Sequence, residues 1–142
     1  MTHHTVLIVG GGAAGVSVAN NMRRQNATID IAIIEPSEKH YYQPGFTIIG
    51  GGAYTLKKTT RNEADLIHPS VQWIKEYADT FQPEENGVTL RSGEVVSYDY
   101  LVVCIFVFYS ISSVVCLNAF NVQSKSGGVI AQCFFVILIT DR

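Results

Sequence analysis

Charged side chains are scarce in this 142-residue chain, since Asp, Glu, Lys and Arg make up 15% of it, against about 25% in an average soluble domain. The formal net charge at pH 7 is −2, so nothing in the composition indicates a nucleic-acid partner or an anionic membrane surface. Cysteine is also scarce, and Cys104, Cys116 and Cys133 fit neither a zinc spacing nor a Cys-x-x-Cys redox motif. We therefore expect no metal site, no catalytic residue among these cysteines and no binding of nucleic acid.

The few charges are distributed unevenly along the chain. Positions 100–124 contain none, and a second apolar run follows at 129–139. The first run is long enough to cross a bilayer, but its Ser and Asn residues and the lack of a basic cluster at its ends weaken that interpretation. We predict a domain over 1–103 and a divergent, aggregation-prone apolar tail over 104–142, with a membrane span as the alternative.

A glycine-rich turn follows the first apolar run, at residues 6–9. That run is apolar throughout, as in a parallel strand covered on both faces, and it leaves no room for a targeting segment before it. Gly10, Gly12 and Gly15 then complete a Gly-x-Gly-x-x-Gly motif. The first glycine permits a tight turn, the second lets a pyrophosphate approach the main chain, and the third lets a helix pack close to the sheet. The free amides at the start of this helix, near Ala13, are expected to face the phosphates.

An acidic residue stands at the distance that such a site requires. Glu35 lies 20 positions after Gly15 and ends a second apolar run, residues 29–35. A carboxylate there accepts hydrogen bonds from ribose hydroxyls and repels a 2′-phosphate, so the pattern favours an adenine dinucleotide without that phosphate. The alternatives are a glycine turn without a ligand and a Glu35 that is simply solvated at a strand end.

The whole pattern predicts an α/β fold, a Rossmann-like domain with an incomplete parallel sheet and a small antiparallel meander. Asn86-Gly87 is a strong hairpin signal within that meander. We predict a helix over 13–25 and strands over 6–9, 29–35, 71–78, 88–91, 94–98 and 99–103.

The segment His40-Tyr41-Tyr42-Gln43-Pro44-Gly45 carries a more specific signal than the glycine turn. Together with residues 6–15, 34–38, 71–75 and 97–103, it resembles the N-terminal part of the sulfide:quinone oxidoreductases, which are flavoproteins with two dinucleotide-binding domains. The resemblance covers residues 5–103. It ends there because the family continues this strand into Ala-Thr-Gly or Ala-Pro-Gly, whereas this chain has Cys104-Ile105-Phe106.

This resemblance implies FAD as the cofactor of an FAD/NAD(P)-binding domain, and it implies which residues contact it. The turn residues would hold the pyrophosphate, and the carboxylate would hold the adenosine ribose. One loop histidine would pass near the ribose and flavin side, and one alanine would touch the adenine through its main chain. The cofactor-binding residues implied in this way are Gly10, Gly12, Ala14, Gly15, Glu35, His40 and Ala78.

The resemblance also implies an activity: two-electron oxidation of sulfide, with electrons passing through the flavin to a quinone. The family acts at the periphery of the mitochondrial inner membrane or of the bacterial cytoplasmic membrane. Its redox cysteines, second dinucleotide domain and quinone site have no counterpart here, so we expect cofactor binding without turnover. A non-catalytic adenine-dinucleotide module, a membrane-tethered protein, and part of another flavin-dependent disulfide or NADH:quinone-type oxidoreductase stay open as alternatives.

Overall fold

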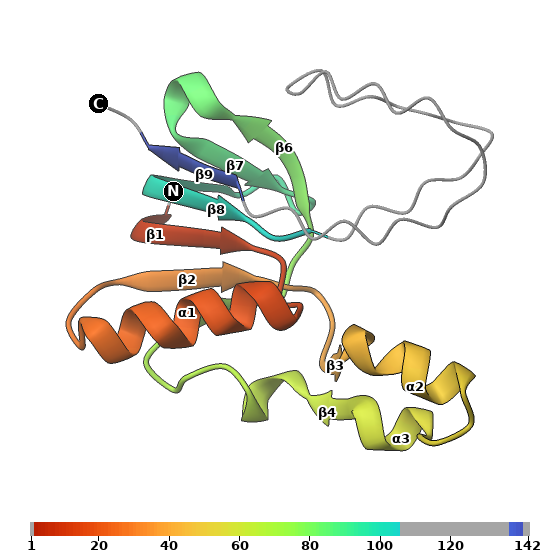
Figure 1. Cartoon of the computed structure of the whole chain (residues 1–142). Helices are drawn as coiled ribbons and strands as arrows, with labels where there is room; N and C mark the ends of the chain where they lie inside the picture. The colour runs from red at the N-terminus through yellow and green to blue at the C-terminus, as the bar shows by residue number, and fades with distance from the viewer. Residues whose placement is uncertain (1, 106–136, 141–142) are drawn as a thin grey trace, which may run out of the picture.

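A mainly parallel sheet forms the centre of the molecule (Figure 1), for which the computed structural model describes residues 2–105 and 137–140. Four neighbouring strands of the sheet are parallel to one another, and two further strands extend one edge of it by antiparallel pairing. In spatial order these are β5 (Gln72–Ile74), β2 (Ile31–Ile34), β1 (Thr2–Val9), β8 (Val95–Val103), β7 (Gly87–Leu90) and β6 (Ala78–Gln82). The α/β fold with a small antiparallel part is thereby confirmed.

Strand β1 is central because its apolar residues are buried on both faces of the sheet. Val6 and Ile8 face helix α1 (Ala13–Gln25), whose Val16 and Ala19 pack against them. The intervening residues, Leu7 and Val9, belong to a second apolar cluster, which they form with residues of β2, β7 and β8. Each fully buried aliphatic side chain of this size contributes about 1.5–3 kcal/mol, so β1 and α1 form a rigid base for the glycine turn between them.

A smaller unit lies beyond the carboxyl end of β2 (Figure 1). In it, β3 (Lys39–Tyr41) pairs antiparallel with β4 (Thr60–Asn62). The connection between them contains a 3₁₀ turn, Gln43–Gly45, and two short helices, α2 (Phe46–Gly50) and α3 (Leu56–Thr59). A second 3₁₀ turn, Glu63–Asp65, follows β4 directly, and it places the Glu63 side chain beside Gly11, in the turn after β1.

The helix prediction is confirmed at both ends, but several strand predictions need correction. The predicted strand 71–78 is two strands, β5 and β6, because the Glu76 amide turns back to donate to the Ile74 carbonyl. Residues 75–77 therefore cross the sheet to its other edge. The predicted strands 94–98 and 99–103 are one strand, β8, which pairs with β7 and with β1. Strand β2, Ile31–Ile34, is two residues shorter at its start and one residue shorter at its end than the predicted 29–35.

The hairpin signal at Asn86-Gly87 is confirmed. Asn86 has φ +48° and ends a third 3₁₀ turn, Pro83–Glu85, between the antiparallel strands β6 and β7. A small polar residue followed by glycine suits this left-handed conformation.

Most of the predicted tail lies outside the described residues, including Cys116, Cys133 and the greater part of the candidate membrane segment 100–124. Four tail residues are described as β9 (Ile137–Thr140), which pairs antiparallel with β8. Cys104 and Ile105 pack against the two apolar clusters. No helix within residues 2–105 and 137–140 is long and apolar enough to cross a membrane.

Candidate functional site

A cavity of about 400 Å³ opens at the carboxyl ends of the parallel strands. The glycine turn after β1 and the segment after β2 form two of its walls, and the crossing segment before β6 forms another. This is the position at which ligands bind in open α/β sheets, because chain reversals there leave main-chain groups free. Six of the seven predicted cofactor-binding residues line it: Gly10, Gly12, Ala14, Glu35, His40 and Ala78.

Gly10 and Gly15 hold the turn tightly against the sheet. Gly10 has φ +104°, and a Cβ on it would collide with the Cys104 carbonyl at the end of β8. A Cβ on Gly15 would collide with the Gly10 carbonyl in the same way. Gly15 is not among the residues that line the cavity, and close packing of helix and turn accounts for it. Both positions thus require glycine for the shape of the turn.

Gly12 and the two residues after it have a different environment. A Cβ on Gly12 would meet no atom within 4 Å, and its φ of −64° is ordinary. The first hydrogen bond of α1 runs from the Val16 amide to the Gly12 carbonyl, so the amides of Ala13 and Ala14 precede the helix's own hydrogen bonds. No side chain caps this end and no acid lies in its first turn. The positive end of the helix is therefore available to an anion.

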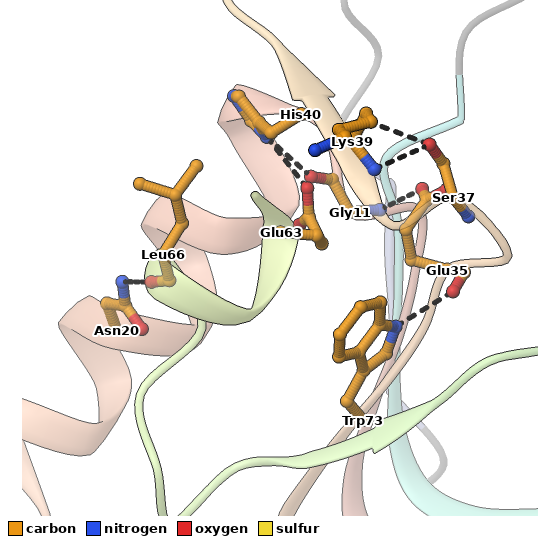
Figure 2. A network of polar contacts seen from close by, with 9 residues as sticks. All are labelled: Gly11, Asn20, Glu35, Ser37, Lys39, His40, Glu63, Leu66 and Trp73. Carbon is orange, nitrogen blue, oxygen red and sulfur yellow. Dashed lines mark hydrogen bonds and ion pairs between the residues drawn. The ribbon is translucent and has the colours of Figure 1, made fainter. Parts of the chain in front are cut away.

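The carboxylate of Glu35 is held by two main-chain amides. Its Oε2 accepts from the Gly11 amide at 2.7 Å and its Oε1 from the Ser37 amide at 2.8 Å. The Glu35 carbonyl accepts from the Trp73 indole at 2.8 Å, so the main chain of this residue is fixed as well (Figure 2). Because an ionised carboxylate has about four acceptor positions, two bonds leave it able to accept from a ligand.

Gly11, the middle residue of the glycine run, is part of the site although the motif does not include it. Its Cα lies so close to two acidic side chains that a Cβ would stand 2.5 Å from Glu35 Cγ and 2.8 Å from Glu63 Oε1. A neighbour at that distance forces a displacement, since carbon atoms pack at about 3.5–4.0 Å. The only signal for Gly11 in the sequence is that it makes three glycines in a row with Gly10 and Gly12.

His40 and Glu63 form a buried pair next to Gly11 of the turn (Figure 2). His40 Nδ1 lies 3.1 Å from Glu63 Oε2 and 3.2 Å from the Gly11 carbonyl, and the two side chains are 6% and 1% exposed. Glu63 Oε1 is buried without a hydrogen-bond partner. Burial raises the pKa of Glu63, the His40 charge opposes that rise, and the Glu35 charge adds to it. Glu63 lies in a polar stretch without a motif, so sequence reasoning missed it.

The third wall comes from the segment that crosses the sheet. Ala78 lines the cavity as the first residue of β6, next to Tyr77. The Tyr77 carbonyl accepts from the Arg91 amide, and the Arg91 guanidinium lies 4.1 Å from the centre of the Tyr77 ring. A cation over an aromatic face at this distance is attractive. These two contacts fix the main chain on which Ala78 sits.

Cys104 also lines the cavity, as the residue that follows β8. Burial raises the pKa of its thiol, whereas a nucleophilic cysteine needs surroundings that lower it. The environment of Cys104 thus agrees with a packing role.

Comparison with known proteins places this geometry in a family. Residues 4–105 match the family model described as pyridine nucleotide-disulphide oxidoreductase. The chain is 46% identical over 99 residues to the mitochondrial sulfide:quinone oxidoreductase of Dictyostelium discoideum, which covers 69% of the chain and 22% of that protein. It is 40% identical over 103 residues to the mouse mitochondrial sulfide:quinone oxidoreductase, covering 72% of the chain and 23% of that protein.

Solved structures agree with the sequence comparison. The sulfide:quinone oxidoreductase of Aquifex aeolicus superimposes with a TM-score of 0.61 at 26% identity, over 76% of this chain and 26% of that one. The NADH:rubredoxin oxidoreductase of Clostridium acetobutylicum does so with a TM-score of 0.59 at 25% identity, over 78% and 30%. This chain thus spans about a quarter of the length of the curated relatives that it matches. The chain belongs to the pyridine nucleotide-disulphide oxidoreductase family and is similar to the N-terminal part of sulfide:quinone oxidoreductases.

Proposed function

We propose that this chain binds FAD through the adenosine diphosphate half of the cofactor. The observation that carries the proposal is the open position above Gly12, at an uncapped helix start and next to an anchored Glu35. The pyrophosphate would lie against the main chain from Gly10 to Ala14. Glu35 would accept from the adenosine ribose, and the main chain at Ala78 would contact the adenine.

The residues present fit such a group by shape and by charge. A phosphate needs amide donors and close approach to the main chain, and Gly12 lacks the Cβ that would block it. The ribose needs an acceptor on the other side of the turn, where Glu35 is already oriented by Gly11 and Ser37. When bound, FAD supplies two-electron redox chemistry through its isoalloxazine ring, and this chain supplies binding and orientation.

For the complete protein we propose the activity that the relatives' names state, oxidation of sulfide coupled to reduction of a quinone. The support is 37–46% identity to three mitochondrial sulfide:quinone oxidoreductases. The names of the same relatives favour a mitochondrial location in a eukaryote. For a bacterial protein, the cytoplasmic membrane is the location that the family resemblance implies. Peripheral attachment to that membrane is part of the same proposal.

We further propose that these 142 residues bind the cofactor without turning over substrate. Cys104 is the one cysteine among the described residues, and burial raises the pKa of its thiol. The test is an assay of sulfide-dependent quinone reduction by the purified chain after addition of FAD. No rate above that of free FAD is expected, and a clear protein-dependent rate would overturn this part.

A second candidate is part of another reductase in the same family. The likeness to the Clostridium NADH:rubredoxin oxidoreductase favours it, since the fold and the share of this chain covered are similar to those for the Aquifex enzyme. Two observations favour the sulfide:quinone assignment. The segment from His40 to Pro44 is more specific to that family than the glycine turn, and the sequence identity to the Dictyostelium protein, 46%, exceeds the 25% to the Clostridium protein. Restoring the remaining family sequence in a chimera and assaying sulfide against NADH as electron donors would separate the two.

A further inference from the structure

The side chain of His40 is directed at the protein's own main chain (Figure 2). Its Nδ1 lies 3.2 Å from the Gly11 carbonyl, and the Gly11 amide donates to Glu35 on the other side. The carbonyl and the amide of Gly11 are thereby held by side chains from two separate segments. These side chains are His40 on β3 and Glu35 in the segment after β2. Gly11 itself is buried, whereas Gly12 is exposed. The orientation of the turn toward a ligand thus depends on how Gly11 is held.

The contact with the carbonyl determines where the proton of His40 lies. A carbonyl oxygen only accepts hydrogen bonds, so the 3.2 Å contact requires that Nδ1 carries the proton. Glu63 Oε2, 3.1 Å from the same nitrogen, accepts from the same N–H group. In the alternative tautomer Nδ1 is an acceptor, and the Gly11 carbonyl loses its donor.

Glu63 is suited to select that tautomer, because its buried carboxylate accepts a hydrogen bond at His40 Nδ1. The titratable groups whose charges act on it within the described residues are His40 on β3 and Glu35 after β2. Its main chain is fixed by a 2.9 Å bond from its amide to the Glu38 carbonyl. A second group that binds one side of a histidine commonly sets which nitrogen holds the proton.

We propose that His40 and Glu63 are positioning residues of the dinucleotide turn: Glu63 keeps the proton on His40 Nδ1, and that N–H group holds the Gly11 carbonyl. The main chain from Gly10 to Gly12 is then fixed before a ligand arrives. The effect on cofactor affinity rests on the proposed function, whereas the state of His40 does not. Preorganised main-chain donors bind more tightly because less ordering accompanies binding.

The first measurement needs neither a cofactor nor a variant. In a long-range ¹H–¹⁵N correlation spectrum of the full chain near pH 7, His40 should show a protonated Nδ1. An unprotonated Nδ1 would overturn the proposal.

In Glu63→Gln, whose side-chain amide both donates and accepts, we expect a mixture of the two tautomers. An unchanged Nδ1–H would remove Glu63 from the proposal.

The second measurement compares FAD affinity across matched variants by quenching of flavin fluorescence. In His40→Asn the side-chain amide has two protons, so it can donate to Gly11 and to Glu63 together. We therefore expect His40→Asn to keep at least threefold more FAD affinity than His40→Leu. His40→Leu has no donor and should lose at least tenfold, with the melting temperature of the cofactor-free protein checking that it is folded.

The outcomes separate this inference from the proposed function. Wild-type protein that fails to bind FAD contradicts the proposed function, while the His40 spectrum still decides the position of the proton. Equal FAD affinity of wild type and folded His40→Leu contradicts the positioning role alone. If His40→Leu does not fold, Glu63→Gln decides: FAD affinity equal to that of the wild type, despite a mixture of His40 tautomers, overturns the role.

Discussion

The amide of Gly11 donates a 2.7 Å hydrogen bond to the carboxylate of Glu35, across 24 residues of sequence. The glycine turn and the acidic residue of a dinucleotide site are usually described as two separate contacts to one ligand. Here they also contact each other within the protein. The proposed acceptor for the ribose and the main chain proposed to hold the phosphates are therefore fixed relative to one another within the protein.

The paired substitutions Gly11→Ala and Gly12→Ala should have opposite effects. A Cβ on Gly11 would stand 2.5 Å from Glu35 Cγ, so Gly11→Ala should lower the free energy of unfolding by roughly 1–3 kcal/mol. Gly12→Ala meets nothing within 4 Å, so it should keep or slightly raise stability. Urea unfolding of the two cofactor-free proteins measures the difference.

The same pair should differ in FAD binding. Gly12→Ala adds a methyl group where the pyrophosphate is proposed to lie, and it should weaken binding by at least tenfold in a protein of normal stability. A stable Gly12→Ala protein with wild-type affinity would count against the proposed position of the pyrophosphate. Equal stability of the two variants would contradict the packing around Gly11.

Replacing Glu35 by Gln should weaken FAD binding by about tenfold or more. The substitution keeps the size of the side chain but removes its charge, and hydrogen bonds to a charged group contribute roughly 1.5–3 kcal/mol. Glu38→Gln is the matched control, since the Glu38 side chain is exposed and does not line the cavity. Its Oε1 lies 2.9 Å from Lys75 Nζ. Isothermal titration with FAD compares the two. A larger loss in the Glu38 variant would contradict the assignment of Glu35.

Glu63 should give the protein a particular pH dependence of stability. Its pKa in the folded state is raised above the ordinary 4.5, mainly by burial. Between 4.5 and the raised value the folded state therefore holds more protons than the unfolded state, so this contribution is full at lower pH and is lost as the pH rises. Relative to Glu63→Gln, which cannot ionise, wild-type stability should fall as the pH rises above 4.5.

Urea unfolding of both proteins at several pH values tests this dependence. His68→Gln, a substitution on an exposed histidine, serves as a control for general effects of pH. A difference between wild type and Glu63→Gln that stays constant with pH would show that Glu63 titrates as an ordinary exposed carboxyl.

Cys104 should react slowly with iodoacetamide in the folded protein. Burial raises the pKa of its thiol, and the thiolate is the form that reacts. At pH 8 we expect labelling at least tenfold slower than in the same protein unfolded in urea, measured on the Cys104 peptide by mass spectrometry. Rapid labelling of the folded protein would indicate an activated thiol and would reopen a catalytic role for it.

The glycine turn could be predicted from the sequence because its requirements are local. Gly10 needs a positive φ and Gly15 a close approach, and both follow from spacing within one turn and one helix. The bounds of α1 were predicted correctly for the same reason, since the turn begins it and Asn26 ends it.

Other parts depend on contacts between distant segments, and the sequence did not reveal them. Glu63 acquires its role from His40 and Gly11, which lie 23 and 52 residues away. The break between β5 and β6 has no glycine or proline to mark it. It forms because β5 pairs with β2 at one edge while β6 pairs with β7 at the other.

Binding of FAD at the glycine turn is the basis of the proposed function. The most direct test is an equilibrium titration of the purified full chain with FAD, followed by flavin fluorescence, beside Gly12→Val as a matched variant. We predict saturable binding of one FAD per chain by the wild type and loss of that binding in a Gly12→Val protein of unchanged melting temperature. Absence of saturable binding to the wild type, or equal binding to both proteins, would contradict FAD binding at this turn.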